Sequence, residues 1–341
     1  MLNLSPVTPL RMVCRGICNH ITNHPSVVSY EVTLSCNCNC RHCDHGGMKR
    51  NERRLGPADY GKMTRLLNPV AVQISGGEPL LRDDILDVVR AIKQSGVPYL
   101  IFVTNGALLN EEVYLQLRLA GMNQLSVSLD FPDERHDEFR QRRGLYRHLE
   151  QVIPQLGAYG YRDIILNTVI TGANLKEIIT LCQRARDWAV SISFSIYTPL
   201  RTGERDYCID TEEDLSLLRG TIGALMDLKK QTDHIVTPTA VLLDTLKFVE
   251  HGYNMPNCKS GMRFLVVTPE GDLIPCSLHR DKRYSVRQEM IEKFSRTNQC
   301  GSCYVSIRSY LDQSLWGLVR TVPTYGKVLL SRQQHQPVST D

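Results

Sequence analysis

The chain has 341 residues, 42% of them hydrophobic and 22% charged, with a formal net charge of +4. This composition suits a globular protein, and the length favours one large domain plus a smaller one. The sequence lacks an apolar stretch of about 18 residues, and Met1–Thr8 lacks a charged start followed by an apolar core. It therefore predicts neither a membrane span nor a secretory signal, and we expect a cytoplasmic protein.

The positive charge is spread along the chain, with short basic runs only at Lys49–Arg54 and Arg140–Arg143. Such runs are typical of solvated loops, so no nucleic-acid partner is expected. A mild positive balance can still help an acidic electron donor, such as a flavodoxin or ferredoxin, to dock.

Short apolar runs rich in β-branched residues alternate with longer amphipathic stretches from Val27 onward. This alternation is typical of βαβ units that close on a parallel sheet. Six such units predict an α/β fold, a partial (β/α)6 barrel whose chemistry lies at the C-terminal ends of the strands. The expected strands are Val27–Leu34, Ala71–Ser75, Tyr99–Thr104, Gln124–Leu129, Ile164–Ile170 and Ile192–Tyr197.

Helix start signals stand between these strands, and a hairpin signal follows them. The hairpin is expected at Phe264–Thr268 and Leu273–Cys276, and a last amphipathic helix at 306–320 is expected to pack on the barrel. The helix signals are Pro57, Asp83 and Asp84 before Ile85, Asn174 with Glu177, Thr211 with two following glutamates, and Thr237 with Pro238.

Twelve cysteines are too few for a disulfide scaffold of this length, and eight of them fall in two groups. The first group contains Cys36, Cys40 and Cys43 in the spacing C-x3-C-x2-C, directly after the first expected strand. Three thiolates can hold three irons of a [4Fe–4S] cluster and leave the fourth iron open for chemistry. A zinc site is the alternative, but this loop offers only one C-x2-C pair. Cys38 is expected to point away from the others.

This cysteine loop resembles that of the radical S-adenosylmethionine (SAM) superfamily, and the resemblance spans residues 28–235. In that family the open iron is chelated by the methionyl amine and carboxylate. The resemblance implies reductive cleavage of SAM, followed by hydrogen abstraction from a substrate by a 5′-deoxyadenosyl radical. It also implies a set of cofactor-binding residues: Gly76, Gly77 and Glu78 at the methionyl amine, Asn105 and Ser128 at the ribose and carboxylate, Arg140 as a guanidinium for the carboxylate, and His42 near the adenine.

The second group consists of Cys258, Cys276, Cys300 and Cys303, and four thiolates suffice for one complete cluster. Zinc suits four thiolates equally well on geometry alone. The pattern resembles the twitch domain, a shortened SPASM domain of radical SAM enzymes, over residues 255–305. This implies one auxiliary [4Fe–4S] cluster, because no cysteine follows Cys303. A closed cluster of this kind would accept an electron rather than bind substrate.

Together these patterns predict five regions, the fourth of which is a small C-terminal β-hairpin and helix iron–sulfur domain. Molybdenum-cofactor cyclases leave one iron of their auxiliary cluster open and end in Gly-Gly. This chain has four cysteines in the second group and ends in Ser-Thr-Asp, so the sequence disfavours that particular function. The five regions are an N-terminal extension at 1–26, the radical SAM partial barrel at 27–235, a linker helix at 236–254, the twitch domain at 255–310, and a C-terminal helix with a disordered tail at 311–341.

Three functions are compatible with these motifs. The first is a radical enzyme acting on a small alcohol, sugar or related metabolite. The second is a peptide or protein maturase, which is disfavoured because only about 26 residues precede the first strand, too few for a leader-binding winged helix. The third is a non-catalytic metal-binding protein, which the open first site argues against.

Substrate-contacting residues are the least constrained by the sequence. Cys208 lies outside both cysteine groups and is a candidate thiol hydrogen donor. Cys14, Cys18 and Cys182 are expected to be ordinary thiols. Further candidates near the barrel mouth are Tyr197 and Arg201 after the sixth strand, and His279 and Arg280 after Cys276.

Overall fold

The computed structural model describes residues 7–304 and 308–312, so most of the helix expected at 306–320 and the tail lie outside the described residues. The described strands form one sheet in the order β6-β5-β4-β3-β2-β1-β7-β8, in which only the β7–β8 pair is antiparallel. The expected α/β fold with a mostly parallel sheet is confirmed. The strands are β1 Val27–Glu31, β2 Ala71–Ser75, β3 Tyr99–Thr104, β4 Gln124–Ser128, β5 Ile164–Ile170, β6 Ser191–Ile196, β7 Phe264–Val267 and β8 Leu273–Ile274.

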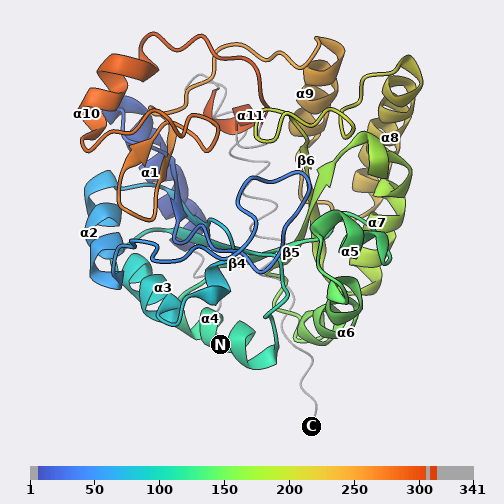
Figure 1. The fold of residues 1–341 in the computed structure, drawn as a ribbon, viewed down its shortest axis with the longest axis horizontal. Helices are drawn as coiled ribbons and strands as arrows, with labels where there is room; N and C mark the ends of the chain where they lie inside the picture. The colour runs from blue at the N-terminus through green and yellow to red at the C-terminus, as the bar shows by residue number, and fades with distance from the viewer. Residues whose placement is uncertain (1–6, 305–307, 313–341) are drawn as a thin grey trace.

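Helices α2, α3, α4, α6, α7 and α8 lie along the outside of the curved sheet (Figure 1). Among the described residues, no helix combines the length and the apolar character needed to cross a membrane. The helices are α1 Val7–Thr22, α2 Pro57–Leu67, η1 Pro79–Leu81, α3 Ile85–Gln94, α4 Glu111–Ala120, α5 Arg135–Arg140, α6 Leu145–Gly157, η2 Gly172–Glu177, α7 Ile178–Asp187, α8 Glu212–Gln231, α9 Thr239–Glu250, α10 Arg287–Met290, the π-helical turn η3 Ile291–Ser295 and α11 Arg308–Leu311.

Successive strand residues alternate between the two faces of the sheet, as a period of two requires. On β1, for example, Val28 and Tyr30 are fully buried in the core, whereas Ser29 faces the interior of the barrel. We expected short, apolar strands, but the strand residues that line the cavity are largely polar. The inward polar residues on the strands are Ser29, Glu31, Gln73, Ser75, Gln124, Ser126, Asn167, Ser193 and Ser195.

Two local expectations differ from the structure. The helix after β5 is capped by Thr171, whose hydroxyl accepts from the Asn174 backbone N–H, and a 3-10 segment precedes α7. The sequence signal at Asn174 therefore marked the third residue of the capped segment rather than its start. In the N-terminal extension, the structure has a helix, α1, that the sequence reading did not include.

The C-terminal hairpin is present and it extends the barrel sheet. Strand β7 pairs in parallel with β1, with Val27 opposite Phe264, while β2 pairs with the other edge of β1. The hairpin thus shares its sheet with the barrel, and the division of the chain into domains stays a prediction. This pairing brings the second cysteine group to the barrel interior.

Candidate active site

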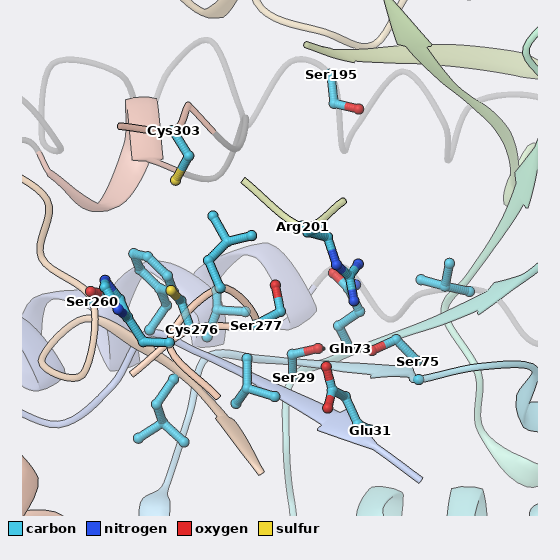
Figure 2. Close-up of a pocket in the computed structure, with 18 of the residues that line it drawn as sticks. Ser29, Glu31, Gln73, Ser75, Ser195, Arg201, Ser260, Cys276, Ser277 and Cys303 are labelled. Atoms are coloured by element: carbon cyan, nitrogen blue, oxygen red, sulfur yellow. Dashed lines mark hydrogen bonds between the residues drawn. The ribbon is translucent and has the colours of Figure 1, made fainter. Parts of the chain in front are cut away.

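The barrel contains a cavity of about 630 Å³ that extends from the end of β2 and His45 to the second cysteine group, whereas Cys36–Cys43 is not among the residues that line it. Gly76 and Ser75, at the end of β2, line it on one side, and the thiols of the second cysteine group line it on the other. Figure 2 shows Cys276 and Cys303 across this space from Glu31 and Ser75. Groups bound at the two ends would therefore face one shared chamber.

The loop that carries Cys36, Cys40 and Cys43 is held by the segment around α5. Backbone N–H groups of Asn39 and Arg41 donate to the carbonyls of Arg140 and Phe139, each at 3.3 Å. Side-chain donors also face the sulfurs, since Arg140 Nη1 lies 3.8 Å from Cys40 Sγ. Such N–H contacts to sulfur are among the features that tune iron–sulfur clusters.

Cys38 does not point away from the other thiols, as the sequence reading expected. Its thiol is hydrogen-bonded to Cys36 and Cys40, and the side chain is buried. The expectation assumed strand-like alternation, but Cys36–Cys43 is an irregular loop, in which residues two apart need not face opposite sides.

The two glycines after β2 allow the closest backbone approach in the site. Gly76 has φ +124°, and a Cβ there would overlap the carbonyl oxygen of Thr33. A Cβ on Gly77 would overlap the carbonyl oxygen of Ser35, the residue directly before Cys36. The Gly77 N–H donates to Thr33 O at 2.7 Å. These glycines form a cradle that any larger residue would fill.

Glu78 is fully buried and joins the ends of β2 and β3. Its carboxylate accepts from Thr104 Oγ1 at 2.8 Å and from the Asn105 backbone N–H at 2.7 Å. Burial raises the pKa of Glu78 to about 7, and these donors oppose that rise. The Asn105 side chain in turn donates to Asn37 Oδ1 at 2.7 Å. Glu78 therefore positions Asn105 against the cysteine loop.

Arg140 forms a buried ion pair with Asp130. Arg140 Nη2 lies 2.6 Å from Asp130 Oδ2, and the Asp130 side chain is fully buried. Burial lowers the pKa of Arg140, but the charge of Asp130 outweighs it and the pKa is raised. Ser128 ends β4 nearby and is also buried. The ion pair of Arg140 is therefore buried and lies next to the cysteine loop.

His42 stacks on Phe139 with ring centroids 4.5 Å apart and an interplanar angle of 13°. Burial, aided by the charge of Arg140, holds the pKa of His42 well below its usual value, so the ring is neutral. Its Nδ1 is buried and lacks a hydrogen-bond partner among the described residues. An unpaired nitrogen on a stacked ring is compatible with a nearby ligand that supplies the missing partner.

Arg308 organises the second cysteine group, and the sequence reading missed it. Its guanidinium donates to Met255 O at 2.7 Å, to Pro256 O at 3.0 Å and to Cys303 O. Its side chain is almost fully buried and is paired with Asp312 at 2.7 Å. One arginine thus ties the segment before Cys258 to the C-x2-C turn. An arginine five residues after Cys303 gave no recognisable sequence signal.

A charged cluster lies at the cavity wall, and the sequence analysis named only some of its residues. Arg201 pairs with Asp44 at 2.7 Å, and Arg280 Nη2 donates to Glu31 Oε1 at 2.5 Å. Both guanidinium groups also lie 2.7 Å from His45 Nε2. The sequence had indicated only the two arginines. Asp44 and His45 directly follow Cys43, and that position was the signal available for them.

The remaining candidates lie at different distances from the cavity. His279 lines it, with its ring against Phe294. Tyr197 is buried, and its hydroxyl donates to Glu204 O at 2.7 Å. Cys208 is buried with its thiol against the Tyr253 hydroxyl, and neither Cys208 nor Tyr197 is among the described residues that line the cavity. The thiol-donor hypothesis therefore gains no support from its position.

Both cysteine groups suit iron–sulfur clusters in donor chemistry. Among residues 7–304 and 308–312, no group of three His, Cys, Asp or Glu side chains is close enough to hold a single metal ion. A cubane cluster binds each thiolate through a different iron, so its ligands stand farther apart than those of one zinc ion. In the second group, all four thiols line one wall of the cavity.

Comparison with known proteins identifies the domain that contains the first group. Residues 30–185 match the model of the Radical SAM superfamily. These residues form a radical SAM superfamily domain, which is an enzyme domain. The family implies SAM and a [4Fe–4S] cluster.

Two relatives illustrate how far the similarity extends. The chain is 30% identical over 193 residues to the AdoMet-dependent heme synthase of Methanosarcina barkeri, covering 54% of each chain. It is 26% identical over 286 residues to the probable GTP 3′,8-cyclase of Methanothermobacter marburgensis, covering 80% of this chain and 91% of the relative. The chain thus spans about half of the first relative and most of the second.

A solved structure shares the fold. The structure of Streptococcus suis SuiB bound to S-adenosylmethionine superposes with a TM-score of 0.61 at 19% identity. The match covers 78% of this chain and 64% of that chain. At this identity the match shows the fold alone.

Replacement of Gly77 by alanine is expected to lower the free energy of unfolding by about 1–3 kcal/mol, because the new Cβ would overlap Ser35 O. Urea denaturation followed by circular dichroism measures this. Gly223→Ala in α8 is the control, since a Cβ there meets no atom within 4 Å and alanine favours the helix. Equal stabilities of the two variants would contradict the close approach.

Asp130→Asn is expected to lower the free energy of unfolding by about 3–5 kcal/mol, since it leaves the buried Arg140 without its counter-charge. Asp87→Asn breaks the exposed Asp87–Arg90 pair and is expected to cost less than about 1 kcal/mol. Thermal and urea unfolding of both variants tests the difference. A loss for Asp130→Asn as small as that of the control would exclude a structural role for the buried pair.

Proposed function

We propose that this chain is a radical SAM enzyme that acts on a small polar molecule bound in the barrel cavity. Cys36, Cys40 and Cys43 would hold the catalytic [4Fe–4S] cluster, and Cys258, Cys276, Cys300 and Cys303 an auxiliary one. When bound, the first cluster would supply the electron for reductive cleavage of SAM, the chemistry by which a 5′-deoxyadenosyl radical would abstract hydrogen from the substrate. A flavodoxin or ferredoxin would provide the electron, and the auxiliary cluster would accept one from the product radical.

The observation that carries this proposal is that Gly76, in the proposed SAM-binding segment, and the second cysteine group line the same cavity. Gly76 and Cys276 both line it, and the strand residues between them are mostly serine, glutamine and asparagine. A substrate held by these uncharged side chains would lie between the two ends. The protein's own contribution is to bind and orient this molecule and to exclude water around it.

The geometry of the loops supports the proposed cofactor-binding roles. The Gly76–Gly77 backbone would bind the methionyl amine, with Asn105, Ser128 and Arg140 near the ribose and carboxylate. His42 would lie beside the adenine, because its ring is stacked and its Nδ1 is unpaired. Glu78 would act by positioning Asn105.

A second candidate is a cyclase acting on GTP, favoured by the relative named probable GTP 3′,8-cyclase, of which this chain covers 91%. The peptide-maturase alternative is weaker. SuiB, which has been solved with a precursor peptide, shares only the fold at 19% identity. The amount of 5′-deoxyadenosine formed with GTP, compared with the amount formed with small hydroxylated molecules, would decide between the GTP cyclase and the enzyme for a small polar molecule.

Iron and sulfide analysis tests the two clusters. Anaerobically reconstituted wild type is expected to hold about eight irons, because two cubanes hold four each. Alanine at Cys36, Cys40 and Cys43 should leave about four irons and abolish the perturbation by SAM of the electron paramagnetic resonance signal. Cys14→Ala and Cys18→Ala are matched controls, since both thiols are exposed on α1. About four irons in wild type would contradict the auxiliary cluster.

Arg308→Met offers an independent test of the auxiliary site. This change removes the donors to three carbonyls around the second cysteine group, so iron is expected to fall from about eight to about four. The signal that responds to SAM should persist, because the first cysteine loop is untouched. Arg296→Met, at an exposed arginine of the same region, is the control and should keep both clusters. Full iron content in Arg308→Met would contradict its organising role.

A further inference from the structure

Glu31 presents an unused carboxylate oxygen at the cavity wall. It ends β1, lines the cavity, and its side chain is only 5% exposed. Arg280 and His45 both lie against Oε1, at 2.5 and 3.6 Å. The other oxygen, Oε2, is buried and has no hydrogen-bond partner among the described residues. A buried polar atom of this kind normally has a partner, so this position calls for a donor from a ligand.

The charge of the surrounding cluster limits what that ligand can be. Two arginines, Arg201 and Arg280, are matched by two carboxylates, Asp44 and Glu31. The cluster is therefore close to neutral apart from His45. No lysine is among the described residues that line the cavity. An added carboxylate or phosphate would meet the unpaired Glu31 oxygen as a like charge, without an uncompensated cation to balance it.

Three buried atoms of the cluster lack a hydrogen-bond partner among the described residues, namely Glu31 Oε2, Arg201 Nε and Arg280 Nε, and the first two belong to residues that line the cavity. Glu31 is ionised: burial favours a higher pKa, but the hydrogen bond with His45 and the charge of Arg280 outweigh it and lower the pKa. Its Oε2 is thus a charge-assisted acceptor, for which an ammonium group is a stronger partner than a hydroxyl. Arg201 Nε is a buried donor that lacks a hydrogen-bond partner among residues 7–304 and 308–312, and it would suit a neighbouring oxygen atom.

We propose that Glu31 Oε2 binds the ammonium group of a hydroxylated amine, with Arg201 Nε donating to an adjacent hydroxyl oxygen of the same molecule. The inward serines and amides on β1, β2 and β4 bind its other hydroxyl groups. This assignment rests on the proposed function and specifies the substrate class of the same cavity. Glu31 is a binding residue here, and no bond is formed or broken on it.

The test is ligand binding to the reconstituted holoenzyme with SAM present, measured by anaerobic titration calorimetry. D-glucosamine, D-glucose and D-glucuronate share one ring and differ in carrying an ammonium, no charge or a carboxylate, and GTP serves as a fourth probe. Glucosamine is expected to bind about tenfold tighter than glucose. Glucuronate and GTP are expected to bind more weakly than glucose. Tighter binding of glucuronate or GTP, or no detectable binding of glucosamine, would overturn the assignment.

Glu31→Gln keeps the size of the side chain and replaces the free carboxylate oxygen. It is expected to remove the preference for glucosamine over glucose while leaving glucose binding within about twofold. Glu212→Gln, an exposed glutamate of α8, is the control and should keep the preference. An undiminished preference in Glu31→Gln would reject Glu31 as the binding residue.

Iron content and 5′-deoxyadenosine formation without substrate, measured on the same samples, separate the two proposals. Wild type that fails to cleave SAM would contradict the proposed function while the binding comparison still stands. Cleavage of SAM together with the wrong ligand preference would contradict only the substrate class.

Discussion

Strand β1 is the structural element on which the site depends, because it pairs in parallel with β2 on one edge and β7 on the other. Parallel neighbours end at the same side of a sheet, so whatever follows each strand is brought together there. The cysteine loop follows β1, the glycine segment follows β2, and the hairpin after β7 leads to Cys276. Three segments far apart in sequence meet because of this one arrangement of hydrogen bonds.

The positions of the strands were predictable to within a few residues, because buried parallel strands carry a strong apolar signal. Three of the six barrel strands, Ala71–Ser75, Tyr99–Thr104 and Ile164–Ile170, have the expected bounds. The first strand ends at Glu31 rather than Leu34, since Thr33 and Ser35 accept hydrogen bonds from the glycine segment instead of continuing the regular ladder. That contact is tertiary and no local pattern encodes it.

The site divides in the same way between local and non-local information. The cysteine and glycine segments could be found because their chemistry depends on spacing along the chain. Glu31 and Arg308 could not, since each acquires its role from partners distant in sequence: Glu31 meets Arg280, and Arg308 meets the carbonyl of Met255. The polar inner wall had a sequence signal, the alternation of Ser29 with Val28 and Tyr30. This signal is lost when the hydrophobicity of the strand is judged as an average over its residues.

The alternation along the strands also separates two kinds of structural constraint. Residues such as Tyr30 and Phe102 pack against the helices and are constrained by volume. Their neighbours Ser29 and Ile101 face the chamber, where a substitution changes the shape and polarity of the wall without disturbing that packing. Substrate choice can therefore diverge within such a barrel through single replacements at alternate positions, while the scaffold and its folding stability are inherited unchanged.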